Sequence, residues 1–503
     1  MNDNITTDDI SILGQHIKNL DLEIELLNQD LQTIDILSGD PIELSYDYDS
    51  SSDCRASCTL KMFVKNSNYT IDDGSKIWLN RYIKIWIKIL SQRTKQWLKY
   101  CIGLFMPLNN DFTYSDTDRL LECKCADLMT ILTNTQLGGA ETTTISADTN
   151  IRSSMIGTIT QLGGIKKYYI ENIGSLQSEG NNTVPYDLTF NCGDSVYDVV
   201  EKLRDLYSGW QTYFDLDTFM CTSIPTNTNS NIILDYQTII DKALVIDEKL
   251  SNDFTKVKNV TEVFGSTIDV DDGRYTDTCT LSGSQYIATF SSTIDALESG
   301  GKYAVKLPSA NLANPTLKID SLTAYSIVDS DGTSLSAGTI DGYSVFEWKN
   351  NLFYYLGKYQ CHAVCIYRGT QPTDTEKTTD KTTYNCDTIG YRINPDGIFT
   401  IEKIGIKKDV KTGSNYDVIY SNDLCLERAK YENWKTVRLA NTLELTMQLV
   451  PWLQVNQLIT YQLKSTGDIK TWTVTKISCS NALSGTMTVE LTEYYPDYPE
   501  SYL

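Results

Sequence analysis

The stretch NTLELTMQLVPWLQVNQLITY, residues 441–461, indicates the fold class most clearly. Apolar and polar residues alternate from Leu443 to Leu449, and a period of two is typical of a β-strand with one buried side and one solvent-facing side. Pro451 then interrupts the strand, because proline has no N–H for a sheet ladder and restricts the preceding residue to extended geometry. We predict that the chain turns a corner here and resumes as a strand over Val455–Leu463. Such corners are common in β-barrels and β-sandwiches.

The composition excludes several classes of protein. A chain of 503 residues is long enough for roughly three or four domains. Its 43 basic and 65 acidic residues give a net charge of −22, which argues against electrostatic binding of nucleic acid or anionic membrane. No apolar run approaches the ~20 residues of a membrane helix, and Asp3, Asp8 and Asp9 stand where a signal peptide would be basic. We expect synthesis in a cytoplasm, with no export and no membrane anchor.

The first 126 residues predict a short helix followed by strands. Apolar residues at helical spacing predict a docking helix over residues 8–20, which Gly14 weakens. The strongest strand is YIKIWIKIL, residues 82–90, whose four isoleucines face one way while Trp86 and two lysines face the other. Trp86 is therefore expected at the solvent or against a neighbouring chain.

The middle of the chain contains one clear helix. Ser195 can cap it together with Asp198, an apolar stripe runs from Val196 to Tyr207, and Gly209 supplies the stop. The segment WQTYFDLDTFMCTSIP that follows is predicted to form a hairpin.

The composition changes between about 275 and 366, where Gly, Ser, Thr and Asn separate many short predicted strands. The region ends in TQPTDTEKTTDKTT, a polar stretch that cannot bury a core. We therefore predict an inserted all-β domain with a linker over 275–385, and we expect it to fold independently.

Two clusters raise the possibility of a metal site. Cys361-His362-x-x-Cys365, with Cys386 beyond it, could bind zinc, but the spacing fits no standard ligand pattern, so buried thiols are favoured. The other cysteines are also expected to be reduced, since thirteen is an odd number and they are scattered.

The second cluster is acidic. Asp269, Asp271 and Asp272 invite a calcium interpretation, but no glutamate occupies the closing position of an EF-hand loop, and a solvated turn is favoured. We predict no metal and no cofactor.

Several segments, taken in order, resemble the baseplate hub or tail-tip proteins of tailed bacteriophages. The resemblance covers roughly 380 residues and lies in the order of the segments. They are LEIELL…SYDYDSSSDCRASCTLKM, GWQTYFDLDTFM, RINPDGIFTIEKIG, ERAKYENW, LANTLELTMQLVPWLQVNQLITY, and the closing WTVTKIS…GTMTVELTEYYP.

This resemblance implies a mainly β fold with α/β parts. Two β-barrel-like tube domains would be joined by a mixed α/β region, with an inserted all-β domain. The implied divisions are an N-terminal helical arm (1–19), a first tube domain (20–126), a mixed α/β domain (127–235), a second tube domain with a helical part (236–274 and 386–503), and the insertion with its linker (275–385).

The resemblance also implies a structural role and a set of partners. Three chains would form a ring that closes the end of the tail tube, and the acidic chain would help to line a channel through which DNA slides without sticking. The implied partners are the chain itself as a homotrimer, the tail tube or distal tail protein, the tape measure protein, and tail spike or fibre proteins. The chain would belong to the virion tail, assembled in the host cytoplasm.

The sequence offers few histidines that could act as a catalytic base. The only histidines are His16 and His362, and the chain ends at YYPDYPESYL, where many relatives continue into a cell-wall hydrolase. We predict that the chain is not an enzyme and has no catalytic, cofactor-binding or metal-binding residues. Two alternatives stay open, a tail-associated cell-wall hydrolase that uses a pair of carboxylates and a glycan-binding adhesin.

The insertion itself is similar to small β modules of phage tail fibres and appendages, through YAVKLPSANLANPTLKIDSLTAYSIVDSDGTSLSAGTIDGYSVFEWKNNLFYYLG. The similarity suggests an outward decoration near the host surface. Trp348, Phe353, Tyr354 and Tyr355 could stack on sugars, but such aromatics more often fill the core of a small β domain, which is the favoured interpretation.

Overall fold

The computed structural model describes most of the chain. Several predicted features lie outside them: His16, Tyr207, Gly209, the aspartates 269, 271 and 272, and the C-terminal residues 495–503. The described residues are 5–15, 18–37, 40–63, 81–115, 117–137, 143–171, 182–184, 187–206, 210–223, 232–268, 270, 274–413, 416–419 and 421–494.

The fold is mainly β, as the sequence predicts, and it divides into two compact units. We call residues 1–257 with 438–503 the sheet unit, and residues 258–437 the insertion unit. Among the described residues, no helix is both long enough and apolar enough to cross a membrane.

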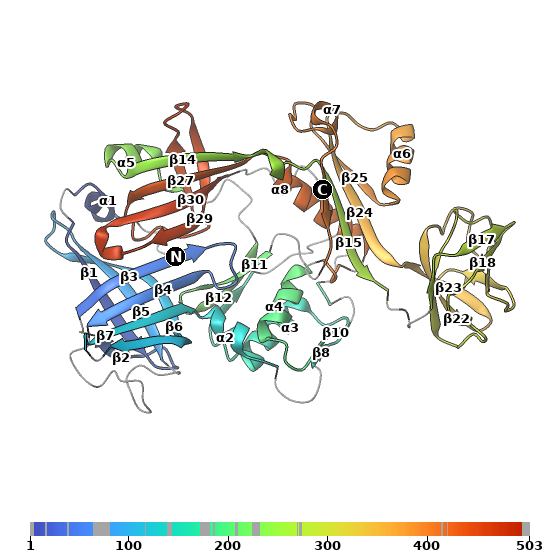
Figure 1. Cartoon of the computed structure of the whole chain (residues 1–503), viewed down its shortest axis with the longest axis horizontal. Coiled ribbons are helices and arrows are strands. Elements are labelled where there is room, and N and C mark those ends of the chain that lie inside the picture. Colours follow the sequence, from blue (N-terminus) through green and yellow to red (C-terminus); the bar gives the residue numbers. More distant parts are fainter. Residues whose placement is uncertain are drawn as a thin grey trace. The chain divides into compact units, whose positions relative to one another are not determined.

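The sheet unit is built on one large sheet in which we find thirteen described strands (Figure 1). Eleven of them follow one another edge to edge, in the order β14 (Val245–Asp253), β27 (Ala440–Gln448), β30 (Thr486–Glu493), β29 (Ile469–Cys479), β3 (Asp40–Asp49), β4 (Ala56–Phe63), β7 (Leu120–Asp127), β6 (Trp97–Ser115), β5 (Tyr82–Leu90), β1 (Leu20–Leu27) and β2 (Thr33–Leu37). Two more, β28 (Leu458–Gln462) and β13 (Ile232–Leu234), branch from β29.

The N-terminal and C-terminal segments meet within this sheet. Strand β3 pairs antiparallel with β29, so that Tyr46 lies opposite Cys479 and Tyr48 opposite Ile477. Side chains from both segments fill one hydrophobic core, whose largest fully buried member is Trp472. Strands assigned by sequence to two tube domains therefore share one sheet. The division into domains stays a prediction.

Residues 441–461 contribute to two strands, as predicted. Strand β27 alternates as expected, with Leu443, Leu445 and Met447 fully buried. The chain then turns, and β28 begins at Leu458 rather than at Val455. The strand starts later because Asn456 takes a left-handed conformation (φ 64°), which is incompatible with an extended strand. The corner carries the chain away from β30 and β14, the partners of β27, to β29 and β13.

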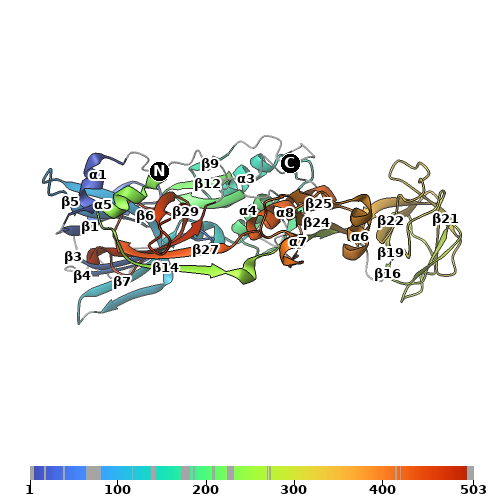
Figure 2. The same cartoon turned by 90° about the horizontal axis from the view of Figure 1, so that it is seen from above.

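Helix α1 (Thr7–Leu13) is shorter than predicted. Thr6 and Asp9 form a capping box at its start, and Ile12 and Leu13 are buried in the core of the large sheet. The helix ends before Gly14, and Leu20, expected at its end, is instead the first residue of β1. Figure 2 shows α1 beside α5 (Tyr236–Asp241), and Gly14 approaches Lys242 at this point.

The rest of the sheet unit mixes helices with short strands. Helix α4 (Val196–Asp205) confirms the predicted capping box, since Ser195 Oγ accepts from the Asp198 N–H and the Asp198 side chain accepts from the Ser195 N–H. The predicted hairpin is β11 (Trp210–Asp215) with β12 (Thr218–Ser223). The remaining described elements are α2 (Met129–Asn134), β8 (Thr143–Ile145), α3 (Ile151–Gly157) with a π-helical turn (Thr158–Leu162), β9 (Tyr168–Ile170), β10 (Leu188–Phe190) and two short 3-10 helices (Phe254–Lys256 and Ala482–Ser484).

The insertion unit contains a four-stranded sheet with helices on both faces. Its order is β25 (Ile389–Ile393), β24 (Gln360–Arg368), β15 (Val260–Thr267) and β26 (Lys408–Lys411). Helix α8 (Asn422–Thr436) packs on one face, where Asn433 reaches Thr261 and Arg392. Residues of α6 (Asp374–Tyr384) and α7 (Ile401–Ile404) pack on the other face around Val260 and Val364.

An eight-stranded sheet lies between β15 and β24 in the sequence. It has its own core around Tyr286, Tyr303, Phe346 and Phe353. The described strands run in the order β16 (Tyr275–Thr276), β19 (Gly301–Lys306), β22 (Tyr343–Lys349), β23 (Leu352–Lys358), β21 (Tyr325–Val328), β20 (Thr316–Ile319), β18 (Gln285–Ala288) and β17 (Cys279–Ser282).

The segment after this sheet differs from the predicted linker. The polar stretch is helix α6, which buries no residue, and β24 is a central strand of the four-stranded sheet. The helix forms because Thr373 and Glu376 make a capping box and Arg368 pairs with Glu376. Asn385, in a left-handed conformation, ends it.

Candidate assembly surface

The outer face of β1, β5 and β6 carries a ladder of paired charges. Acidic residues on β1 lie opposite lysines on β5, and Lys88 Nζ lies 2.6 Å from Asp21 Oδ2. Glu23 accepts from Lys99 at 2.6 Å and lies 3.6 Å from Lys88. The charges in these pairs neutralise one another, so this face holds little net charge for a charged ligand.

Trp86 lies on this outer face, as the alternation predicts, and it is half-buried. The ammonium of Lys84 lies 4.6 Å from the centre of its ring, a cation–π geometry. The indole N–H is buried and has no hydrogen-bond partner among the described residues. The tryptophan is therefore partly covered within the chain, and its predicted contact with a neighbouring chain stays a prediction.

The two outermost strands of the large sheet expose apolar side chains. On β2, Ile36 is 51% exposed and Ile34 nearly as much, and within the described residues β2 pairs only with β1. At the opposite edge, Ile246 of β14 is 58% exposed, and β14 pairs only with β27 in the described part of the chain. Exposed apolar edges are rare in free proteins, because they are templates for pairing with another chain.

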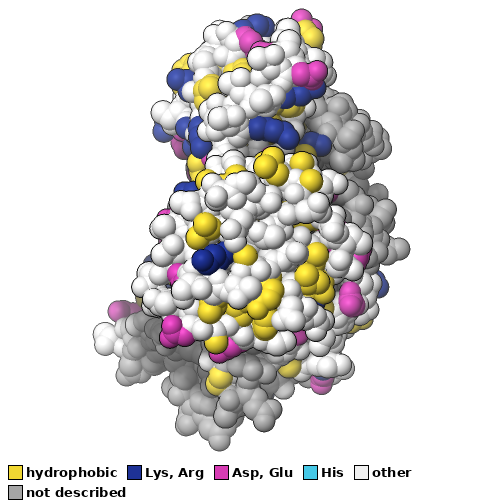
Figure 3. Space-filling view, turned by 90° about the vertical axis from the view of Figure 1, so that its right-hand side faces the viewer, with side chains coloured by type: hydrophobic (Ala, Val, Ile, Leu, Met, Phe, Trp, Pro, Cys, Tyr) yellow, Lys and Arg dark blue, Asp and Glu magenta, His cyan; other side chains and the backbone are white. Residues whose placement is uncertain are grey.

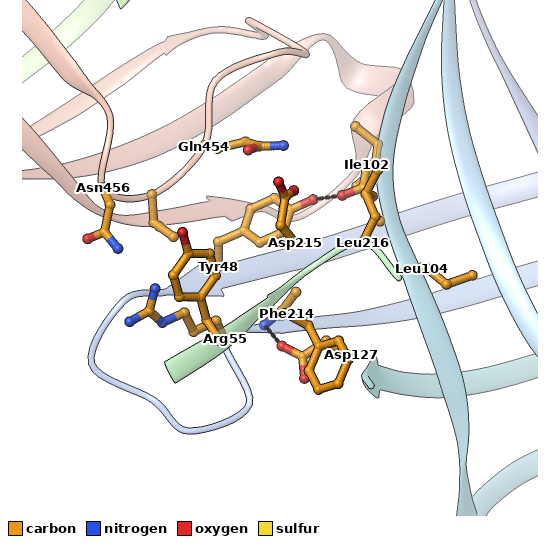
Figure 4. Close-up of a pocket in the computed structure, with 14 residues that line it drawn as sticks. Tyr48, Arg55, Ile102, Leu104, Asp127, Phe214, Asp215, Leu216, Gln454 and Asn456 are labelled. Carbon is orange, nitrogen blue, oxygen red and sulfur yellow. Dashed lines mark hydrogen bonds between the residues drawn. The ribbon is translucent and has the colours of Figure 1, made fainter. Parts of the chain in front are cut away.

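A small cavity lies in the same unit, between the large sheet and the β11–β12 hairpin (Figure 4). Its volume is about 80 Å³, and its wall contains the buried side chains of Arg55 and Asp127. Burial raises the pKa of Asp127 to about 6, against the lowering effect of the Ala56 and Met129 N–H groups, which it accepts at 2.9 Å.

Arg55 joins the sheet to the hairpin. Its guanidinium donates to Gln211 Oε1 at 2.9 Å and lies 4.4 Å from the centre of the Tyr213 ring. Asn456, from the corner after β27, donates to the same Gln211 oxygen at 3.1 Å. These contacts connect three segments that are distant in sequence. We interpret the cavity as a structural joint, since a binding pocket for an organic ligand usually needs roughly 300–1,000 Å³.

The Cys-His cluster lies on both faces of β24. His362 Nε2 lies 2.8 Å from Glu262 Oε1, and its ring stacks on Phe264 at 4.1 Å. Burial pushes the pKa of Glu262 up, but hydrogen bonds from His362 and Lys408 outweigh it and hold that pKa below its usual range.

The thiols of this cluster make separate contacts. Cys386 Sγ donates to backbone oxygens of His362 and Thr388, and burial raises the pKa of the Cys365 thiol to about 12. Among the described residues, no group of three or more His, Cys, Asp or Glu side chains could hold a metal ion.

The aromatic residues singled out in the insertion occupy different places. Phe353 is fully buried in the core of the eight-stranded sheet, and Tyr355 lies against Phe346 at 6.0 Å. Tyr354 carries Lys349 over its ring, and Trp348 packs edge-on against Tyr325. They form no single platform for stacking on a sugar.

Sequence reasoning missed the edge strand β2 and the joint at which Arg55 and Asn456 contact Gln211. The segment TIDIL of β2 does alternate, which was an available signal. The joint had no such signal, because it depends on contacts between segments up to 245 residues apart.

Comparisons with known proteins give one family match and several structures. Residues 396–498 match the family described as a domain of unknown function (DUF5048). No curated protein matches the chain.

Among solved structures, the chain is similar to prophage tail protein gp18 from Listeria monocytogenes EGD-e, with 8% identity over 93% of this chain and 94% of that one (TM-score 0.42). It is also similar to the tail protein from Neisseria meningitidis MC58, with 10% identity over 95% and 99% (TM-score 0.45). The 43 kDa tail protein of prophage MuSo2 from Shewanella oneidensis is 9% identical over 95% and 99% (TM-score 0.45). The chain is thus similar to phage tail proteins over nearly its whole length.

Proposed function

We propose that this chain is a structural baseplate hub or tail-tip protein of a tailed phage. Three copies form a ring that closes the end of the tail tube, connects it to the host-contacting tip and leaves a channel for DNA ejection. The observation that carries the proposal is the large sheet, which unites both halves of the chain and exposes apolar residues at both of its outer strands. The sequence segments that resemble hub proteins supply most of this sheet.

The two exposed edges suggest how the copies meet. In a head-to-tail contact, β2 of one copy pairs with β14 of the next, so each copy uses two different surfaces. A repeated contact of this kind closes into a ring when the rotation between copies divides the circle evenly. Backbone hydrogen bonds would then continue the sheet from copy to copy, and Ile36 and Ile246 would leave water.

Electrostatics favours a conduit over a nucleic-acid-binding protein. The net charge of −22 repels phosphate, so DNA passes without lasting contact. The further partners in the proposal are the tail tube or distal tail protein, the tape measure protein, and tail spike or fibre proteins.

The proposal includes no catalytic activity. Asp127 has the raised pKa of a general acid, but it accepts two backbone hydrogen bonds at the wall of an 80 Å³ cavity, which is too small for a polysaccharide. His362 is engaged with Glu262. Host cell walls incubated with the pure protein should release no reducing ends or amines, and concentration-dependent release would establish the hydrolase alternative instead.

The number of copies tests the proposal directly. Mass measurement of purified tail tips should give three copies of this 56.7 kDa chain per tip. Two or six copies would contradict the ring, and absence of the protein from the tail would contradict the location.

A further inference from the structure

The outer strand of the four-stranded sheet forms a second exposed edge, in the insertion unit. Within the described residues, β26 pairs only with β15. Ile398 is 63% exposed, Ile406 is 59% exposed and Val410 is 48% exposed. Lys403 and Lys407 are also exposed, and neither has an ion-pair partner in the described part of the chain. We call these five residues the cationic edge.

One buried side chain holds this edge in place. Asn259 is fully buried, and its amide nitrogen donates to the carbonyl oxygens of Phe399 at 3.1 Å and Gly405 at 2.8 Å. Its Oδ1 accepts from the Lys407 N–H at 2.7 Å. Asn259 therefore ties the residues next to Ile398 and Ile406 to the start of β15.

The helix before β26 is fixed as well. Arg368 is buried, and its Nε lies 3.1 Å from Glu402 Oε1 at the start of α7. The exposed apolar residues therefore stand on a rigid support, and binding to them would require little ordering of this surface. Figure 3 shows one face of this unit, with lysine and arginine side chains gathered on its upper part.

We propose that the cationic edge binds an extended, acidic segment of another protein, in which apolar and carboxylate residues alternate. Such a segment would add a strand to β26, placing apolar side chains against Ile406 and Val410 and carboxylates near Lys403 and Lys407. Charge supports this partner, because two unpaired lysines beside an open strand are unusual on a chain with 65 acidic and 43 basic residues. The inference goes beyond the ring proposed above and does not depend on it.

Synthetic peptides test the inference on the full chain. The probe is a fluorescent seven-residue peptide of alternating valine and glutamate, and its counterpart alternates valine and lysine. Fluorescence anisotropy should show binding of the glutamate peptide that weakens with added salt, and at least about tenfold weaker binding of the lysine peptide. Hydrogen exchange should show new protection at residues 406–411. Equal binding of the two peptides, no binding, or protection confined to β2 or β14 would overturn the inference.

Surface variants locate the binding. The double variant Lys403→Glu with Lys407→Glu should weaken binding of the glutamate peptide by about tenfold or more and improve binding of the lysine peptide. Ile406→Ser with Val410→Ser should weaken both. Lys464→Glu is the matched control, since Lys464 is exposed in the sheet unit, and it should change neither affinity. Equal losses in the control and the edge variants would also overturn the inference.

Discussion

The large sheet and the inserted eight-stranded sheet both bury a hydrophobic core, but their edges differ. The large sheet ends in β2 and β14, of five and nine residues, with exposed isoleucines on each. The inserted sheet ends in β16 and β17, of only two and four residues. Short edge strands protect a sheet against pairing with other chains, whereas long apolar edges favour it. The edge strands of the inserted sheet are thus too short to invite pairing, whereas those of the large sheet are long enough for the pairing with a neighbouring copy that we propose.

The largest expected effect concerns the core of the large sheet. Leu445→Asp places an unpaired carboxylate at a fully buried position of β27, opposite Val489. We expect a loss of more than about 4 kcal/mol in the free energy of unfolding, enough to prevent folding of the sheet unit. Circular dichroism and urea unfolding measure it. The exposed Thr442 of the same strand supplies the control Thr442→Asp, which should fold normally, and a normally folded Leu445→Asp protein would refute this account of the core.

Deleting the inserted sheet should leave the rest of its unit intact. The ends of the insertion are adjacent, because Thr267 pairs with Gln360 and the Ile268 N–H donates to the Tyr359 oxygen at 2.9 Å. A short Gly/Ser linker in place of 275–358 should therefore give a soluble protein in which hydrogen exchange still shows a protected four-stranded sheet. Replacing 275–385 also removes β24 and should destroy that sheet. If both deletions behave alike, β24 is not its central strand.

A cavity in the core of the inserted sheet should destabilise that sheet and leave the large sheet unchanged. Phe353→Ala removes a fully buried ring and should lower the stability of the inserted sheet by about 3–5 kcal/mol. Its transition should separate from that of the large sheet, because the two cores are distinct. Segment-resolved hydrogen exchange measures both, with Leu312→Ala at an exposed position as control. Equal loosening of both sheets would show that they are one cooperative unit.

The two sheets also differ in buried charge, which gives a smaller, pH-dependent effect. The buried polar residues of the inserted sheet, Thr276, Asn311 and Ser344, are uncharged, whereas the sheet unit buries Asp127. Its pKa is about 6 when folded and 3.8 as the reference for the unfolded chain. The folded state therefore holds this proton more tightly than the unfolded chain does. The stabilisation that the protonated Asp127 contributes is fully present below pH 3.8 and is lost as the pH rises through 6.

The shift corresponds to a contribution on the order of 2–3 kcal/mol. The Asp127→Asn variant cannot titrate at this position. The stability of the wild-type protein relative to this variant should therefore fall between pH 4 and pH 7, as measured by urea unfolding at each pH. A constant difference would show that Asp127 titrates normally.

Local patterns predicted much of the fold. The alternation of β5 and the capping box of α4 each depend on neighbouring residues, and both are confirmed. Helix α6 was missed because its threonine-rich sequence has no apolar stripe, and its stability depends on Arg368, which precedes the segment.

The candidate surfaces were less accessible to sequence reasoning. The exposed edges of β2 and β26 follow from which strand ends a sheet, and that order depends on long-range pairing, as between β3 and β29. The Arg55 joint depends on such pairing as well.

The central claim is that neighbouring copies continue the large sheet from β2 to β14. A photo-crosslinking amino acid at position 36, in tail tips assembled from a mixture of isotope-labelled and unlabelled chains, tests it directly. Mass spectrometry should find crosslinks to residues 245–253 that join labelled to unlabelled copies, and the same amino acid at position 398 should give none to that strand. Crosslinks from position 36 that stay within one copy, or that reach other parts of the neighbouring copy, would contradict the account.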